Sequence, residues 1–172
     1  VKEAGVKIWV YCEHHRGEIT DVSLQCLEKG RQIAQSLGAA LEGVALGSEA
    51  DEVRHRACQG GISALYIARA QGLETFISHR YIRVLRRLVD EHHPHVLLFP
   101  ASTQGNDLAP ALAGAMRCPA VMDCVDISVE DSALVCRRLE YDRKVLTRYV
   151  PLVLSPCIVS LVDGVCEVPG PL

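Results

Sequence analysis

Residues 101–107, with the sequence ASTQGND, carry the side chains that could most readily bind a ligand. They follow an apolar run and combine hydroxyl and amide groups with a glycine, which lets a backbone approach a ligand closely. A helix that begins here would add free N–H groups and the positive end of its dipole, which attract anions. The candidate phosphate-binding residues are therefore Ser102, Thr103, Gln104, Gly105 and Asn106.

The same loop also fits an ordinary strand-to-helix turn that binds nothing. In that interpretation Ser102 or Thr103 caps the helix by accepting a backbone hydrogen bond. Asp107 is expected in the first helical turn, where it would suit the dipole but repel an anion. The loop matches neither G-x-x-x-x-G-K-[ST] nor G-x-G-x-x-G, so no strong nucleotide motif decides between the two interpretations.

Two histidine-containing segments could bind a metal, but their spacing favours a structural role. Glu13, His14 and His15 follow the first predicted strand, and EHHPH occupies residues 91–95. Adjacent histidines on a loop point in different directions, and neither segment has a third ligand at a suitable spacing. Histidines at a helix C-terminus also interact well with the dipole. We expect no metal site.

A row of arginines, Arg80, Arg83, Arg86 and Arg87, recurs at helical spacing. It predicts a solvated helix face or one that meets an acidic partner, with nucleic acid as the weaker alternative. The net charge of -3 and the pI near 6.2 argue against nucleic acid, since a basic domain would be expected. No Ser–His–Asp or Cys–His pattern indicates independent catalysis.

The composition is that of one globular domain. The chain has 172 residues, 49% of them hydrophobic and 23% charged. No segment approaches about 18 apolar residues without a charge, so we expect no membrane insertion. The first residues lack the pattern of a secretion signal, which predicts a cytoplasmic protein, or a mitochondrial matrix protein in a eukaryote.

Eight cysteines are a high number, but none forms C-x-x-C and most lie in apolar runs. We predict free, mostly buried thiols. A thiol-based redox protein is a weaker alternative. The cysteines are Cys12, Cys26, Cys58, Cys118, Cys124, Cys136, Cys157 and Cys166.

Strands and helices alternate over the first two thirds of the chain. We predict strands at 6–12, 40–47, 64–68 and 95–101, and helices at 21–38, 48–61, 77–93 and from 106 onward. Asp21 and Ser48 are the expected N-caps, and Gly38 is the expected end of the first helix. The alternation predicts a three-layer α/β fold with a mostly parallel, Rossmann-like sheet.

After residue 118 the pattern becomes all β. Four β-like runs lie at 119–129, 132–141, 144–154 and 157–164, with no crossover helix between them. We expect antiparallel strands added to the edge of the sheet. We predict a single domain over 1–165, with 166–172 as a tail or a truncated linker.

The loops at 12–17, 46–48 and 102–106 each follow a predicted strand. Ligands of open α/β sheets bind at the carboxyl ends of the strands. The three loops could therefore converge at one crevice, which motivates the hypothesis of a stand-alone adenine-nucleotide-binding domain.

Two segments resemble the alpha subunit of electron transfer flavoproteins. Residues 10–47 resemble its opening strand, Glu-His-basic-Gly turn and first helix, with Glu13, His14, Arg16 and Gly17 in the turn and one additional His. Residues 97–127 resemble its second motif. The matching positions there are Thr103, Gly105, Asp107, Leu108, Ala109, Pro110, Asp123 and Cys124, while Asn106 replaces the usual Arg.

The resemblance implies a fold of the adenine nucleotide alpha hydrolase-like type and a scaffold role in an electron-carrying assembly. In that family a second, C-terminal domain holds most of the FAD contacts, and this chain stops about where the linker to it would start. A related beta-type subunit is the implied partner, with a homo-oligomer as the alternative. That subunit commonly holds AMP, whereas the equivalent alpha-subunit pocket is usually empty. FAD is thus expected in the assembly rather than on this chain alone, and AMP is the alternative ligand.

Overall fold

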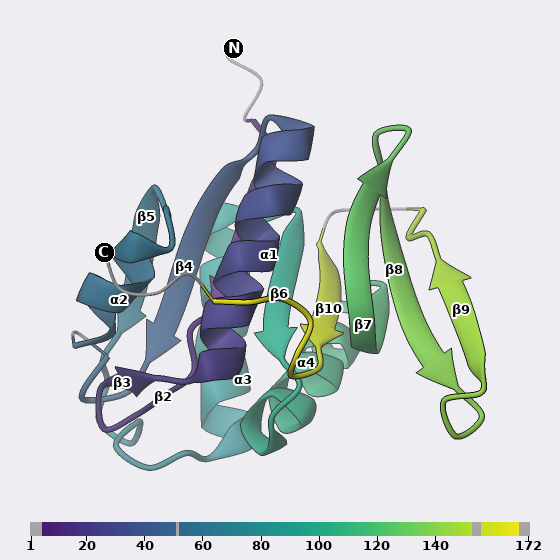
Figure 1. Cartoon of the computed structure of the whole chain (residues 1–172). Helices are drawn as coiled ribbons and strands as arrows, with labels where there is room; N and C mark the ends of the chain where they lie inside the picture. The colour runs from purple at the N-terminus through teal and green to yellow at the C-terminus, as the bar shows by residue number, and fades with distance from the viewer. Residues whose placement is uncertain (1–4, 51, 153–155, 169–172) are drawn as a thin grey trace.

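A computed structural model describes residues 5–50, 52–152 and 156–168 of the chain. It has three layers, with a sheet covered by helices on both faces (Figure 1). The helices are α1 (Asp21–Leu37), α2 (Val53–Gln59), α3 (Ser78–His92) and α4 (Thr103–Met116). The strands of the large sheet are β1 (Lys7–Tyr11), β4 (Ala40–Leu46), β5 (Ala64–Ala68), β6 (Val96–Pro100), β7 (Ala120–Glu130), β8 (Ala133–Glu140), β9 (Val145–Tyr149) and β10 (Cys157–Leu161).

The sheet has eight strands in the order β5-β4-β1-β6-β10-β7-β8-β9. The strands from β5 to β7 are parallel, and β7, β8 and β9 are antiparallel. This confirms the predicted fold class. Figure 1 shows β8 and β9 at one end of the sheet, beyond the part that the helices cover.

The prediction for the last strand was wrong. We expected β10 within the antiparallel addition, but it lies in the middle of the sheet, parallel to both β6 and β7. All five of its residues are buried. A strand that is covered on both faces has a continuous apolar sequence. Parallel strands are typically buried in this way. The connection from β6 through α4 to β7 therefore leaves room for one strand between β6 and β7, and β10 occupies that place.

The core consists of two apolar layers, one on each face of the sheet. Alternate residues of a strand point to opposite faces. Ile8 and Val10 accordingly pack with residues of α1 and α2, whereas Trp9 and Tyr11 pack with residues of α3 and α4. Strand β1 is thus buried on both sides and anchors the loop that follows it.

The helix ends differ from the prediction in three places. Thr20, not Asp21, caps α1, because its hydroxyl accepts a hydrogen bond from Ser23 N–H. Helix α2 begins at Val53 without a side-chain cap, so the expected cap at Ser48 was wrong. Helix α4 begins at Thr103, earlier than expected, which places Asp107 beyond the first turn. Gly38 ends α1 in the left-handed conformation, as predicted, with φ of 62°.

Gly105 lies inside α4 rather than in a loop. A Cβ atom at this position would lie 1.8 Å from the carbonyl oxygen of Pro100. The glycine is therefore required for the close approach of α4 to the end of β6. Its presence needs no ligand as an explanation.

A small hairpin follows β1. Strands β2 (His14–His15) and β3 (Glu18–Ile19) pair around Arg16 and Gly17, both with positive φ. A side chain at Gly17 would also meet Glu52 at 2.6 Å. Among the described residues, none of the helices has the length and apolar character needed to cross a membrane.

Candidate functional site

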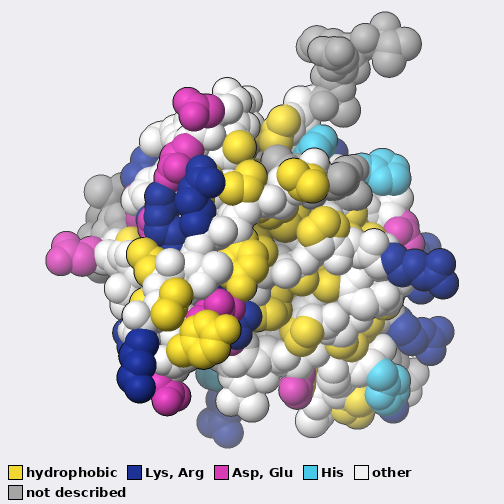
Figure 2. Space-filling model, turned by 90° about the vertical axis from the view of Figure 1, so that its right-hand side faces the viewer, with side chains coloured by type: hydrophobic (Ala, Val, Ile, Leu, Met, Phe, Trp, Pro, Cys, Tyr) yellow, Lys and Arg dark blue, Asp and Glu magenta, His cyan; other side chains and the backbone are white. Residues whose placement is uncertain are grey.

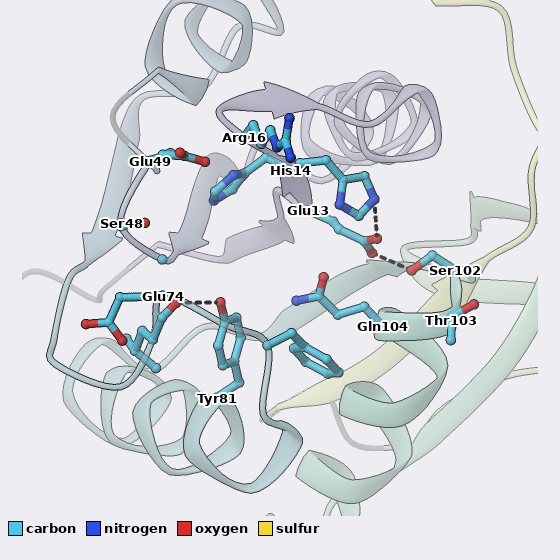
Figure 3. Close-up of a pocket in the computed structure, with 14 residues that line it drawn as sticks. Glu13, His14, Arg16, Ser48, Glu49, Glu74, Tyr81, Ser102, Thr103 and Gln104 are labelled. Carbon is cyan, nitrogen blue, oxygen red and sulfur yellow. Dashed lines mark hydrogen bonds and ion pairs between the residues drawn. The ribbon is translucent and has the colours of Figure 1, made fainter.

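A cleft of about 660 Å³ lies at the carboxyl edge of the parallel strands (Figure 3). The loops after β1, β4 and β6 meet there, which confirms the predicted convergence of these three segments. A fourth segment, between β5 and α3, closes the opposite side. Its contribution was not predicted from the sequence. The cleft is lined by Glu13, His14, His15, Arg16, Gly47, Ser48, Glu49, Leu73, Glu74, Phe76, Tyr81, Ser102, Thr103 and Gln104.

The Glu13 carboxylate lies at the start of α4, against the residue that caps this helix. The Ser102 hydroxyl donates a hydrogen bond to the Glu13 carboxylate (Figure 3). The hydroxyl oxygen accepts one from Gly105 N–H at 2.9 Å. The Glu13 side chain is almost fully buried, since only 3% of the residue is exposed. A phosphate bound at this helix end would lie against a buried carboxylate, which opposes its binding.

The backbone around Glu13 is held by α1. Glu13 N–H donates to the Ser23 hydroxyl at 3.0 Å, and its carbonyl accepts from Thr20 N–H at 3.0 Å. Because the start of α1 fixes both backbone groups, the carboxylate is directed at Ser102 by the fold.

Three of the five candidate phosphate-binding residues line the cleft, and two do not. Ser102, Thr103 and Gln104 line it, and Gln104 donates a hydrogen bond to the hydroxyl of Tyr11 at 2.8 Å. Gly105 is buried, whereas Asn106 is exposed and its N–H donates to the Ser102 carbonyl within α4.

The histidines of both segments make structural contacts. His14 lies with Nε2 2.9 Å from the Leu46 carbonyl oxygen, and His95 accepts a hydrogen bond from Lys7 N–H at 3.2 Å. His93 ends α3 in the left-handed conformation, and His92 packs on the ring of Tyr66. Over residues 5–50, 52–152 and 156–168, no group of three or more His, Cys, Asp or Glu is arranged to hold a metal ion.

The side of the cleft that sequence reasoning missed is acidic and aromatic. Glu74 and Phe76 come from the loop before α3, and Tyr81 comes from its second turn. Tyr81 donates a hydrogen bond to the Leu73 carbonyl at 3.1 Å and meets Phe76 edge to face. Burial raises the pKa of Tyr81 above its ordinary value, so it stays a neutral donor. With Glu49 also at the rim, the cleft suits a neutral ring better than a polyphosphate.

A second feature lies on the antiparallel strands, at the far end of the sheet. Every large hydrophobic side chain that is exposed among the described residues falls within residues 141–152. Figure 2 views the molecule from this side and shows hydrophobic side chains gathered across the face. We call this set the apolar edge; it consists of Tyr141, Val145, Leu146, Val150 and Leu152.

Ion pairs hold this part of the sheet in shape. Arg137 on β8 contacts Asp126 and Glu130 on β7, and Arg148 on β9 contacts Glu130 at 3.0 Å. Lys29 of α1 reaches Asp126 at 3.0 Å. The antiparallel strands are thus tied to one another and to α1, and β9 carries Val145 and Leu146 of the apolar edge.

Comparison with known proteins identifies the family. The model of the electron transfer flavoprotein domain matches residues 8–172, nearly the whole chain. The chain belongs to the electron transfer flavoprotein family. The match confirms the resemblance found in the sequence.

Curated relatives of this flavoprotein domain point to the alpha-type branch. The electron transfer flavoprotein subunit alpha of Clostridium acetobutylicum is 30% identical over 162 residues, which cover 93% of this chain and 48% of that protein. Protein FixB of Azorhizobium caulinodans is 26% identical, over 94% of this chain and 45% of that protein. The acryloyl-CoA reductase electron transfer subunit beta of Anaerotignum propionicum is 28% identical, over 72% and 34% respectively. The chain spans about half the length of the first two relatives.

Ser102 is expected to stabilise this flavoprotein domain through both of its hydrogen bonds. Ser102→Ala removes the helix cap, worth about 1 kcal/mol, and the hydroxyl partner of a buried carboxylate, worth about 1–3 kcal/mol. Ser102→Asp keeps a capping group but places a second carboxylate against Glu13, so it should destabilise at least as much. Urea unfolding measures both.

Ser36→Ala is the matched control, because Ser36 is exposed on α1 and only bonds the Gln32 carbonyl. Its effect should stay within about 0.5 kcal/mol. A Ser102→Asp variant as stable as the native chain would contradict the contact between Ser102 and Glu13.

The thiols follow the prediction of free, mostly buried cysteines. All eight are free, and five are buried. Burial raises the pKa of Cys12 and of Cys157 to about 12, so both stay protonated and unreactive at neutral pH. Cys58 on α2 is the exposed one.

Native-state labelling with iodoacetamide should therefore modify Cys58 within minutes. The five buried cysteines should react only after unfolding, because a thiol reacts as its exposed thiolate. Mass spectrometry of digested protein locates each label. Rapid labelling of Cys12 or Cys157 in the folded chain would contradict their burial.

Proposed function

We propose that this chain is the scaffold domain of an alpha-type electron transfer flavoprotein subunit, which binds a beta-type subunit in an FAD-dependent electron-transfer assembly. The observation that carries the proposal is the apolar edge. Leu152 is 96% exposed and Tyr141 is 77% exposed. Large apolar side chains that are exposed together within one segment favour a surface that a partner covers. A second copy of the chain is the alternative occupant.

The proposal assigns the redox chemistry to FAD and the positioning of subunits to this chain. Flavin chemistry belongs to the cofactor, while the protein supplies binding, orientation and electrostatics. The buried Glu13 at the start of α4 opposes a phosphate in the cleft, which supports FAD binding at the level of the assembly rather than by this chain alone. The cytoplasm, or the mitochondrial matrix in a eukaryote, remains the proposed compartment.

The proposed domain covers residues 1–165, with 166–172 as a tail or a linker. After β10 the chain crosses over α1, as Figure 1 shows. Gln25 of α1 accepts hydrogen bonds from Gly164 and Val165 N–H at 2.9 and 3.2 Å, and it donates one to Asp163. These contacts support a defined exit path for the chain on the α1 side of the sheet.

Co-purification with a beta-type subunit tests the proposal. The chain and the subunit are co-expressed, and the complex is examined by gel filtration with a visible spectrum. A yellow complex that loses its flavin when this chain is removed supports the assembly. A chain that never co-purifies with a flavoprotein would refute it.

A stand-alone adenine-nucleotide-binding domain is the second candidate. The position of the cleft at the carboxyl edge favours it, as do the aromatic rings of Phe76 and Tyr81. Calorimetry with AMP, ATP and FAD distinguishes the two functions. The absence of binding heat at millimolar ligand would end this candidate.

A further inference from the structure

A groove of about 650 Å³ runs between β5 and α3. It lies at the opposite end of the sheet from β9, because β5 and β9 are the two outermost strands. The groove adjoins the cleft at Leu73, and the two share no other lining residue. The groove is therefore distinct from both surfaces used in the proposed function.

The groove has an apolar floor and a basic rim. Ile67, Val84 and Leu88 are half-buried along the floor, while the arginines of the rim are exposed. Four arginines line it, against a single carboxylate, although the chain as a whole carries a net charge of -3. They are Arg69, Arg80, Arg83 and Arg87, and the carboxylate is that of Glu91. Positive charge is thus concentrated at this edge.

Two arginines of α3 that line the groove have no carboxylate partner among the described residues. Among the described residues, neither Arg83 nor Arg87 lies within 4.0 Å of a carboxylate oxygen. Arg86, on the same helix but outside the groove, pairs with Asp90 at 3.7 Å. Arg83 and Arg87 are therefore available to an external anion, while Arg80 also donates a hydrogen bond to the Gly72 carbonyl at 3.1 Å.

The wall of the groove formed by β5 offers backbone groups. Ile67 and Ala68 at the end of β5 line it, followed by residues 69–71 of the next loop. Strand β5 is the outermost strand of the sheet and pairs with β4 alone, so its other edge is free. Strand β5 contains no charged residue and no proline, the usual devices that block pairing at an edge. Its free edge can pair with another extended chain.

We propose that the groove between β5 and α3 binds an acidic, extended segment of a partner protein, which pairs with β5 and sets carboxylates against Arg80, Arg83 and Arg87. The spacing suits this arrangement. The three arginines rise along the helix in steps of about 5 Å, close to the roughly 6.6 Å between alternate side chains of a strand. This docking site goes beyond the proposed function, because it does not involve the apolar edge.

A labelled octapeptide of alternating Glu and Val tests the site by fluorescence anisotropy with the whole chain. Arg87→Glu should weaken binding at least about tenfold, because it reverses a charge within the groove. Arg86→Glu, the matched control, makes the same change one residue away and should weaken binding less than about twofold. Thermal unfolding confirms that both variants are folded.

Hydrogen exchange of the peptide complex supplies the second readout. The amides of β5 that point away from β4 should be protected by the peptide, since pairing at the free edge engages them. Equal losses in the two variants, no binding up to about 1 mM, or binding without protection of β5 would each overturn the proposal. Tighter, Arg87-dependent binding of single-stranded DNA of equal charge would also overturn it in favour of nucleic acid.

Discussion

Gly105→Ala is expected to destabilise the domain by more than about 3 kcal/mol. The new Cβ would lie 1.8 Å from the Pro100 carbonyl oxygen. Because the backbone fixes the positions of both atoms, no side-chain rotation can relieve this clash. Helix α4 would have to move away from β6, which would disturb the buried contacts of Leu108 and Leu112. Chemical unfolding measures the loss, or soluble yield does so if the variant fails to fold.

Gly114→Ala is the matched control on the same helix. A Cβ at Gly114 meets nothing within 4 Å, so the substitution should instead stabilise the chain by about 0.5–1 kcal/mol through helix propensity. If Gly105→Ala were as stable as Gly114→Ala, the close packing of α4 on β6 would be wrong. The glycine would then need a different explanation, such as the approach of a ligand.

Leu152→Asp, combined with Leu146→Asp, is expected to weaken binding of the beta-type subunit more than about 100-fold. Each change removes an apolar anchor and places a charge in a desolvated interface, and losses of 2 kcal/mol or more are typical of such central residues. Leu152 is 96% exposed and Leu146 is 58% exposed, so the free chain should keep most of its stability. Titration of the purified subunits measures the affinity.

Lys144→Gln is the control, because Lys144 is exposed in the turn between β8 and β9 and does not belong to the apolar edge. It should change affinity less than about threefold. Unchanged affinity of the double variant would exclude the apolar edge as the subunit interface. A thermal melt of the variants separates this result from a general loss of folding.

The strands that alternate with helices could be predicted because each is a short apolar run that is visible in the local sequence. Residues 64–68 form β5, as predicted, and β1, β4 and β6 fall within one or two residues of their predicted bounds. A buried strand needs a short apolar run, and a helix on each side supplies the stop signals. The position of β10 could not be predicted the same way. An apolar run shows that a strand is buried but does not show which strands are its neighbours.

The location of the cleft could likewise be predicted from the sequence, but its side-chain contacts could not. Its location followed from topology alone, since loops after parallel strands must share one edge of the sheet. The contact between Glu13 and Ser102 joins residues 89 positions apart and leaves no local signal in either segment. The start of α4 was misplaced because Gly105 resembles a loop residue, whereas it is a helical glycine that permits close packing.

Hydrogen exchange of this chain, alone and bound to a beta-type subunit, tests whether the apolar edge is the subunit interface. We expect protection of β8, β9 and residues 141–152 in the complex, with the cleft and the β5 edge unchanged. Protection confined to the cleft or to the β5 edge, with residues 141–152 still exchanging as in the free chain, would contradict it.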